Sequence, residues 1–142
     1  KPEGGMNVSM GFGGDSDFFD ATNPRARAYV WNKCKQNYFD KGVALFWLDE
    51  AEPEFGVYDY EHFRCFLGPY LQVGNVYPQL YSRTFYDGMQ AEGEQEIVNL
   101  VRCAWAGSQR YGALVWSGDV HSTFRYLKMQ MVAGLQMGLA GI

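Results

Sequence analysis

Two carboxylates occupy comparable places in this sequence, each shortly after an apolar run that contains a tryptophan. Asp49 follows Val-Ala-Leu-Phe-Trp-Leu, and Asp119 follows Ala-Leu-Val-Trp-Ser-Gly. Continuous apolar runs of this kind are typical of parallel strands buried on both faces. In a barrel of parallel strands the carboxyl ends converge on one mouth, where the chemistry of that fold takes place. Two carboxylates and two tryptophan faces at such a mouth would suit cleavage of a glycosidic bond, with one acid and one nucleophile or base.

Each carboxylate also has a structural interpretation. Asp49 could cap a helix or a turn, and Asp119 belongs to a Ser-Gly-Asp sequence that is typical of turns. Around Asp49, however, the residues Glu50, Glu52 and Glu54 place further carboxylates directly after the apolar run, where like charges repel one another. No structural role accounts for that crowding, so we interpret it as functional.

Arg102 lies at the end of a third apolar run, between the two carboxylates in the sequence. Such an arginine usually forms an ion pair at the surface. Between two catalytic carboxylates it would instead hold charge and orient a substrate hydroxyl through charge-assisted hydrogen bonds.

The composition indicates a globular protein without a nucleic-acid or membrane partner. In 142 residues, 47% are hydrophobic and 20% are charged, which allows one domain with a packed core. The net charge of -4 and the lack of a Lys/Arg run argue against nucleic acid. No apolar stretch approaches the roughly eighteen residues of a membrane span. Aromatic residues, at 17%, favour a sugar-binding surface, although an aromatic-rich core explains part of that enrichment.

The cysteines and histidines predict neither a disulfide framework nor a metal site. Cys34, Cys65 and Cys103 are odd in number, far apart and without a CxxC pair, so we expect reduced, mostly buried thiols and a cytoplasmic protein. His62 and His121 lack the order of a catalytic triad and the spacing of metal ligands. A Gly-Phe-Gly-Gly stretch at residues 11–14 is only a weak match to a phosphate-binding loop.

The hydrophobic periodicity predicts alternating helices and parallel strands in one α/β unit over residues 1–142. Asn23 as N-cap and Pro24 in the first turn begin a helix over residues 25–40, which Gly42 ends. The other predicted elements are a strand at 43–48, a long connection at 49–74, a helix at 78–92, strands at 97–103 and 113–116, a helix capped by Ser122 with Phe124, Leu127, Met131 and Leu135 on one face, and the start of a fourth strand at 138–142. Three or four such strands leave apolar edges uncovered, so we expect a section of a (β/α)8 TIM-type barrel, incomplete as it stands.

The sequence around both carboxylates resembles glycoside hydrolase family 31, the retaining α-glucosidases and α-xylosidases. In that family the nucleophile strand ends in Trp-x-Asp, commonly continued as Met-Asn-Glu-Pro, and this sequence reads Trp-Leu-Asp-Glu-Ala-Glu-Pro at residues 47–53. The acid/base strand ends in Trp-x-Gly-Asp after an Arg…Ala-Gly-x-x-Arg stretch. The matching residues are Arg102, Ala106, Gly107, Arg110, Trp116, Gly118 and Asp119. The similarity extends from about residue 19 to residue 142.

The resemblance implies an exo-acting, α-glucosidase-like enzyme that cleaves α-glycosidic bonds by double displacement through a covalent glycosyl-enzyme. Asp49 would be the nucleophile and Asp119 the general acid/base, and no metal or organic cofactor would be needed. Substrate contacts would come from Trp47, Glu50, Arg102, Trp105 and Trp116. Glu50 and Ala51 replace the usual Met and Asn, so the pocket beside the nucleophile differs from the common pattern.

Several alternatives remain open at this point. An α-xylosidase or an α-glucosyltransferase would use the same chemistry, on an α-linked xyloside or with a sugar as the acceptor. A non-catalytic sugar-binding module would account for the aromatic residues, but not for two convergent carboxylates with an arginine between them. A third interpretation is a fragment that holds the catalytic pair without the whole pocket, inactive alone and completed by other copies or by the rest of its barrel.

Overall fold

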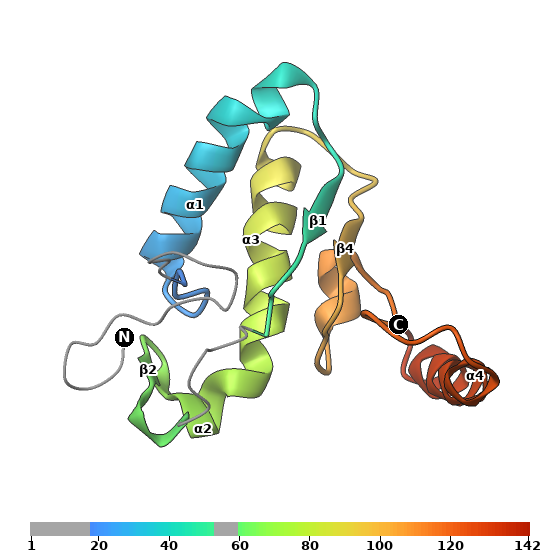
Figure 1. Ribbon diagram of the computed structural model, residues 1–142. Coiled ribbons are helices and arrows are strands. Elements are labelled where there is room, and N and C mark those ends of the chain that lie inside the picture. Colours follow the sequence, from blue (N-terminus) through green and yellow to red (C-terminus); the bar gives the residue numbers. More distant parts are fainter. Residues whose placement is uncertain (1–17, 53–59) are drawn as a thin grey trace.

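Three parallel strands form the centre of the protein in the computed structural model, which describes residues 18–52 and 60–142 (Figure 1). The strands are β1 (Phe46–Leu48), β4 (Asn99–Val101) and β5 (Ala113–Val115), and their order in the sheet is β1-β4-β5. Both pairings are parallel, with Trp47 opposite Leu100 and Leu100 opposite Leu114. The predicted parallel α/β arrangement is therefore confirmed.

The helices α1 (Pro24–Asn37) and α3 (Tyr77–Ala91) run side by side along one face of this sheet (Figure 1). As predicted, Asn23 caps α1, with its side chain accepting a hydrogen bond of 2.9 Å from the amide of Arg25. A short 3-10 helix, η1 (Phe39–Lys41), follows and ends at Gly42, whose φ of 93° is left-handed. These local signals place the first helix within a few residues of its predicted bounds.

The hydrophobic core lies between these helices and the sheet. Its buried side chains are Trp31, Leu48, Phe85, Met89, Ile97 and Val101. Gly88 permits the close approach of α1 to α3, because a Cβ there would lie 2.2 Å from the indole ring of Trp31. Leu48, the strand residue next to Asp49, is therefore held in this core.

The opposite face of the sheet is not covered by described residues. Trp47 is 65% exposed and Leu114 is 56% exposed, although both lie in the centre of their strands. The prediction of a strand at 43–48 buried on both faces is therefore wrong in two respects. Pairing begins only at Phe46, opposite Asn99, and burial is confined to the side that faces the helices.

Much of the predicted connection at 49–74 has regular structure. It contains η2 (Tyr60–His62), β2 (Arg64–Cys65), β3 (Gly68–Pro69), α2 (Tyr70–Val73) and η3 (Gly74–Val76). Strands β2 and β3 pair antiparallel, and Asp20 binds their turn by accepting a hydrogen bond of 2.6 Å from the amide of Phe66. This segment is tied to the start of α1 by contacts over more than forty residues of sequence, which local patterns do not reveal.

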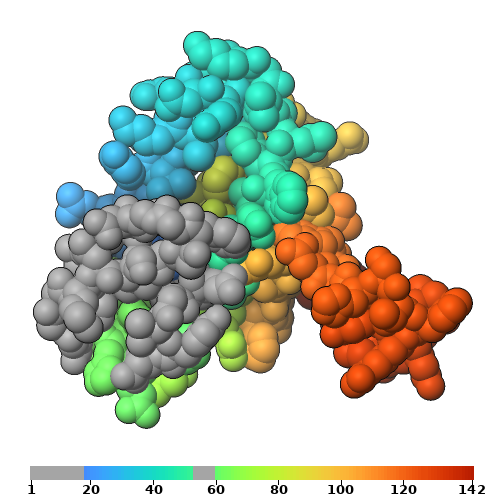
Figure 2. All heavy atoms as spheres, in the orientation of Figure 1, coloured from blue at the N-terminus to red at the C-terminus, as the bar shows by residue number. Residues whose placement is uncertain are grey.

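A last helix, α4 (Phe124–Leu139), projects away from the rest of the protein (Figures 1 and 2). Its N-cap is Thr123, not Ser122, and none of its side chains is buried. Its predicted apolar face is present but exposed, with Phe124 at 91% and Leu135 at 71%. No helix among the described residues is long and apolar enough to span a membrane.

The strand predicted at 138–142 is wrong, because α4 continues to Leu139 and then ends in a turn. Gly141 has a φ of 80°, and the amide of Ile142 donates to the carbonyl of Met137 at 3.0 Å. The amide of Gly141 also donates to the carbonyl of Gly138 at 3.1 Å. This pair of bonds is the Schellman ending of a helix, for which a glycine at that position is the usual residue.

Candidate active site

The two candidate catalytic carboxylates follow strands of the same sheet at the same edge. Asp49 comes directly after β1, Arg102 directly after β4, and Asp119 shortly after β5. Because all three strands are parallel, these residues leave the sheet at its carboxyl end. Both aspartate side chains are exposed, and the strand of Arg102 lies between their two strands.

Arg102 gathers the carboxylates that crowd the end of β1. Its Nη2 lies 3.1 Å from Glu50 Oε1 and still closer to Glu52 Oε1, and its Nε lies 3.7 Å from Asp49 Oδ1. The side chain of Arg102 is only 21% exposed. One guanidinium therefore faces three carboxylates in a partly desolvated place, where charge pairing is stronger than in water.

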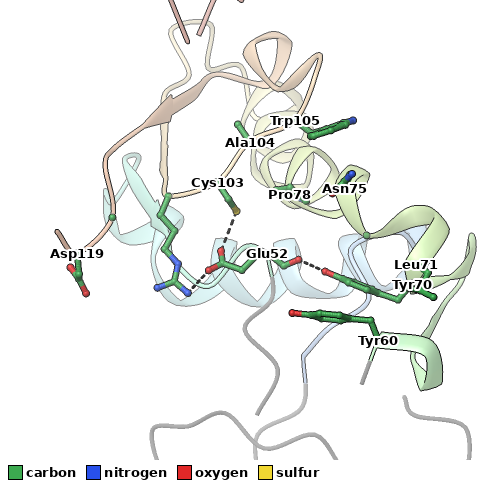
Figure 3. A pocket seen from close by; sticks show the side chains of 13 residues that line it. Glu52, Tyr60, Tyr70, Leu71, Asn75, Pro78, Cys103, Ala104, Trp105 and Asp119 are labelled. Atoms are coloured by element: carbon green, nitrogen blue, oxygen red, sulfur yellow. Dashed lines mark hydrogen bonds and ion pairs between the residues drawn. The ribbon is translucent and has the colours of Figure 1, made fainter. Parts of the chain in front are cut away.

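Glu52 has further partners at both ends of the residue (Figure 3). Its Oε2 accepts a hydrogen bond from the thiol of Cys103 at 3.1 Å, and its carbonyl accepts one from the hydroxyl of Tyr70 at 2.5 Å. The ring of Tyr70 stacks on that of Tyr60, with centroids 5.5 Å apart. Burial, and next the bond to Glu52, raise the pKa of the Cys103 thiol above its usual range, and burial does the same for the pKa of Tyr70.

The backbone turns sharply between Asp49 and Glu52. Glu50 has a φ of 55°, which is uncommon for a residue with a side chain. Asp49 Oδ1 accepts a hydrogen bond of 3.0 Å from the amide of Glu50, and Ala51 is completely buried. Such strained conformations persist where surrounding contacts enforce them, and they concentrate at functional sites.

A wide groove of about 750 Å³ opens beside this cluster (Figure 3). Its lining residues are Glu52, Tyr60, Tyr70, Leu71, Gly74, Asn75, Pro78, Arg102, Cys103, Ala104, Trp105, Gly118 and Asp119. It therefore brings together Arg102, Trp105 and Asp119 of the predicted site. Trp105 is 51% exposed and its amide is held by Ser108 Oγ at 3.0 Å, at the start of η4 (Ser108–Tyr111).

The other two predicted tryptophans form a pair. The rings of Trp47 and Trp116 meet edge to face, with centroids 5.4 Å apart, although they come from the two outer strands of the sheet. Neither ring, nor Asp49 or Glu50, is among the described residues that line the groove. The predicted site residues therefore fall into two groups. Trp105 and Asp119 line the groove, and Trp47, Asp49, Glu50 and Trp116 lie outside it. Arg102 lines the groove and also contacts Asp49 and Glu50.

The remaining sequence predictions concern cysteines, histidines and metals. The three cysteines are free thiols as predicted, but they are half-buried instead of mostly buried. Over residues 18–52 and 60–142, no group of three His, Cys, Asp or Glu side chains is arranged to hold a metal ion. His121 lies edge to face against Tyr126, with ring centroids 5.5 Å apart, near the start of α4. Glu54 and the glycine stretch at 11–14 lie outside the described residues.

Comparison with a family model identifies the protein family of this chain. The model for the glycosyl hydrolases family 31 TIM-barrel domain matches residues 1–142. The chain belongs to glycosyl hydrolase family 31. The family that the motifs resembled, and the parallel α/β fold as a segment of its TIM barrel, are both confirmed.

Individual relatives extend this finding. A family 31 α-xylosidase from a soil metagenome, solved with xylose, has 62% identity and a TM-score of 0.96, over 100% of this chain and 21% of that chain. A protein of Pseudescherichia vulneris that is named an uncharacterized family 31 glucosidase is 61% identical over 97% of this chain and 26% of its own length. Alpha-xylosidase A of Aspergillus niger is 31% identical over 87% of this chain and 20% of its own length. The chain thus spans 20% to 26% of the length of these proteins.

Three residues of the cluster were not predicted as site residues. These residues are Glu52, Tyr70 and Cys103. Two signals in the sequence point to Glu52: the crowding of carboxylates after β1, and its match to the Glu of the Met-Asn-Glu-Pro continuation. The contacts of Tyr70 and Cys103 with Glu52 join positions 18 and 51 residues apart, so no local pattern reports them.

Proposed function

We propose that this chain carries the catalytic carboxylates of a retaining α-glycosidase that hydrolyses α-xylosides. The observation that supports this most is the convergence of Asp49 and Asp119 on the carboxyl edge of one parallel sheet, with Arg102 between their strands. The exposed ring of Trp105 and the half-buried tyrosine rings that line the groove would supply the flat apolar faces that sugar rings favour. Membership of the glycosyl hydrolases gives the arrangement its chemical context.

The mechanism follows from the two carboxylates. Asp49, ionised, attacks the anomeric carbon, while Asp119, protonated, donates its proton to the departing glycosidic oxygen. A covalent glycosyl-enzyme forms as the bond to the leaving group breaks. Asp119, now a carboxylate, takes a proton from water, which attacks the same carbon and releases the sugar with its original configuration. Arg102 lies 3.7 Å from Asp49 and would hold a substrate hydroxyl next to it.

The identity of the sugar is the finer part of the proposal. The sequence motifs favoured an α-glucoside first and an α-xyloside second. The 62% identical relative is an α-xylosidase bound to xylose, whereas the 61% identical relative is named a glucosidase. We therefore place xylosides first and keep glucosides as the alternative. The ratio of kcat/KM for p-nitrophenyl α-xyloside and p-nitrophenyl α-glucoside decides between them.

We do not expect residues 1–142 alone to turn over a glycoside substrate. The groove is open, and the sheet face that carries Trp47 is exposed. The assay therefore belongs in the full-length protein that contains this segment. Glycosyl transfer to a second sugar would appear in the same assay as a product larger than the substrate.

Replacing each aspartate separates their roles. We expect Asp49→Ala to lose activity even on an activated aryl glycoside, because no covalent intermediate forms. Asp119→Ala should lose far more activity on poor leaving groups than on activated ones, and added azide should give a glycosyl azide of retained configuration. Asp87→Ala, which breaks an exposed ion pair with Arg83 on α3, is the matched control. Full activity of Asp49→Ala would overturn the assignment.

A further inference from the structure

We propose that Glu52 is a positioning residue that fixes the guanidinium of Arg102 beside Asp49. The inference rests on the proposed function, because it concerns the same site. It adds a role to a residue that touches Arg102 more closely than Asp49 or Glu50 does.

Glu52 is held through three separate atoms. One carboxylate oxygen binds Arg102 Nη2, the other accepts from Cys103 Sγ, and the backbone carbonyl accepts from Tyr70. Cys103 follows Arg102 on the segment after β4, and Tyr70 begins α2, so Glu52 links three segments of the chain. The stacking of Tyr60 on Tyr70 makes the last of these anchors rigid.

The competing carboxylates explain why such an anchor matters. Arg102 Nε is 3.7 Å from Asp49, beyond ordinary hydrogen-bond length, while its Nη2 is engaged with Glu52 and Glu50. If Glu52 lost its charge, the guanidinium would be drawn towards Asp49. A tight pair there would stabilise the ionised nucleophile and make it a weaker attacking group, and would also move Arg102 away from a substrate hydroxyl.

The position of Glu52 on the chain fits this role. The left-handed turn at Glu50 and the buried Ala51 direct the following residue back towards the end of β4. Glu52 also lines the groove together with Asp119. The same residue therefore borders both groups of predicted site residues.

The test uses the full-length protein and an activated aryl α-glycoside. Glu52→Gln keeps the shape of the side chain and removes its charge. We expect kcat to fall by about 100-fold, the scale of a misplaced catalytic group, with KM changed much less. The matched control is Glu92→Gln, because Glu92 is equally exposed, at 33% against 35%, and its ion pair with Lys35 lies outside the site. The control should keep wild-type kcat.

Two further variants distinguish positioning from a general structural effect. Tyr70→Phe keeps every charge but removes the bond to the Glu52 carbonyl, so kcat should fall by a smaller factor in the same direction. In an Arg102→Lys background, Glu52→Gln should cost little more, since Glu52 acts through Arg102 and the two losses are not additive.

The outcomes separate this inference from the function on which it rests. Wild-type protein without activity on any α-glycoside would refute the proposed function and this role with it. An active wild type with Glu52→Gln within twofold of Glu92→Gln would refute the positioning role alone. So would an undiminished effect of Glu52→Gln in the Arg102→Lys background.

Discussion

The segments that follow β1 and β5 bring the two candidate catalytic aspartates to one edge of the sheet, but they are held very differently. After β1, residues 49–52 are fixed by Arg102, Cys103 and Tyr70, and the strand itself packs on the core through Leu48. After β5, Asp119 is exposed, and the chain leads into α4, which buries no side chain. The half of the candidate site that holds Asp49 is therefore ordered by contacts within this chain. The half that holds Asp119 leads into a helix with no buried side chain.

The largest expected difference between the halves comes from truncating one leucine in each. Leu48 is 2% exposed and Leu135 is 71% exposed. Leu48→Ala should lower the free energy of unfolding of residues 1–142 by about 2–5 kcal/mol, because it leaves a cavity under β1. Leu135→Ala should change it by less than about 0.5 kcal/mol. Urea unfolding followed by tryptophan fluorescence measures both, and equal losses would contradict the comparison.

Replacing either of two glycines by alanine should change the free energy of unfolding, with opposite signs. A Cβ on Gly88 would lie 2.2 Å from the Trp31 ring, whereas one on Gly134 of α4 would meet nothing within 4 Å. Gly88→Ala should therefore lower the free energy of unfolding by about 1–3 kcal/mol, because the added methyl group overpacks the contact with Trp31. Gly134→Ala should stabilise α4 by up to about 1 kcal/mol, since alanine favours helix. The same unfolding experiment applies, with helicity from circular dichroism as the readout for α4. A destabilising Gly134→Ala would show that α4 is packed after all.

A smaller effect, on the reactivity of Cys103, tests the contact between this thiol and Glu52. Burial and the bond to Glu52 raise the pKa of Cys103, so its thiolate fraction at pH 8 is low and its alkylation by iodoacetamide should be slow. The rate should still be rising well above pH 9. Glu52→Gln removes the nearby negative charge, which lowers that pKa and should speed alkylation at pH 8 by a few-fold. Burial, the larger cause, remains. Cys34, which is away from Glu52, should react at an unchanged rate in the same sample, as measured by peptide mass spectrometry.

The sequence predicted those features that depend on neighbouring residues. Asn23 and Pro24 start α1 through local chemistry, and Asp49 and Asp119 reach one edge because parallel strands share a direction. The ordered segment at 60–76 was missed because Asp20 holds it from a distance. The apolar residues at 138–142 suit a strand or a helix end equally, and only the bonds around Gly141 decide for the helix. The contacts that tie Glu52 to Tyr70 and Cys103 are likewise long-range.

The central claim, that Asp49 is the nucleophile of a retaining α-glycosidase, is tested most directly by trapping the covalent intermediate. A 5-fluoro-α-xylosyl fluoride should form a glycosyl-enzyme that breaks down slowly, because the fluorine destabilises the oxocarbenium-like transition state. Digestion and mass spectrometry of the labelled full-length protein then locate the sugar. We predict a single label on Asp49, absent from Asp49→Ala and present in Glu92→Gln. A label on Glu50, Glu52 or Asp119 would contradict the account.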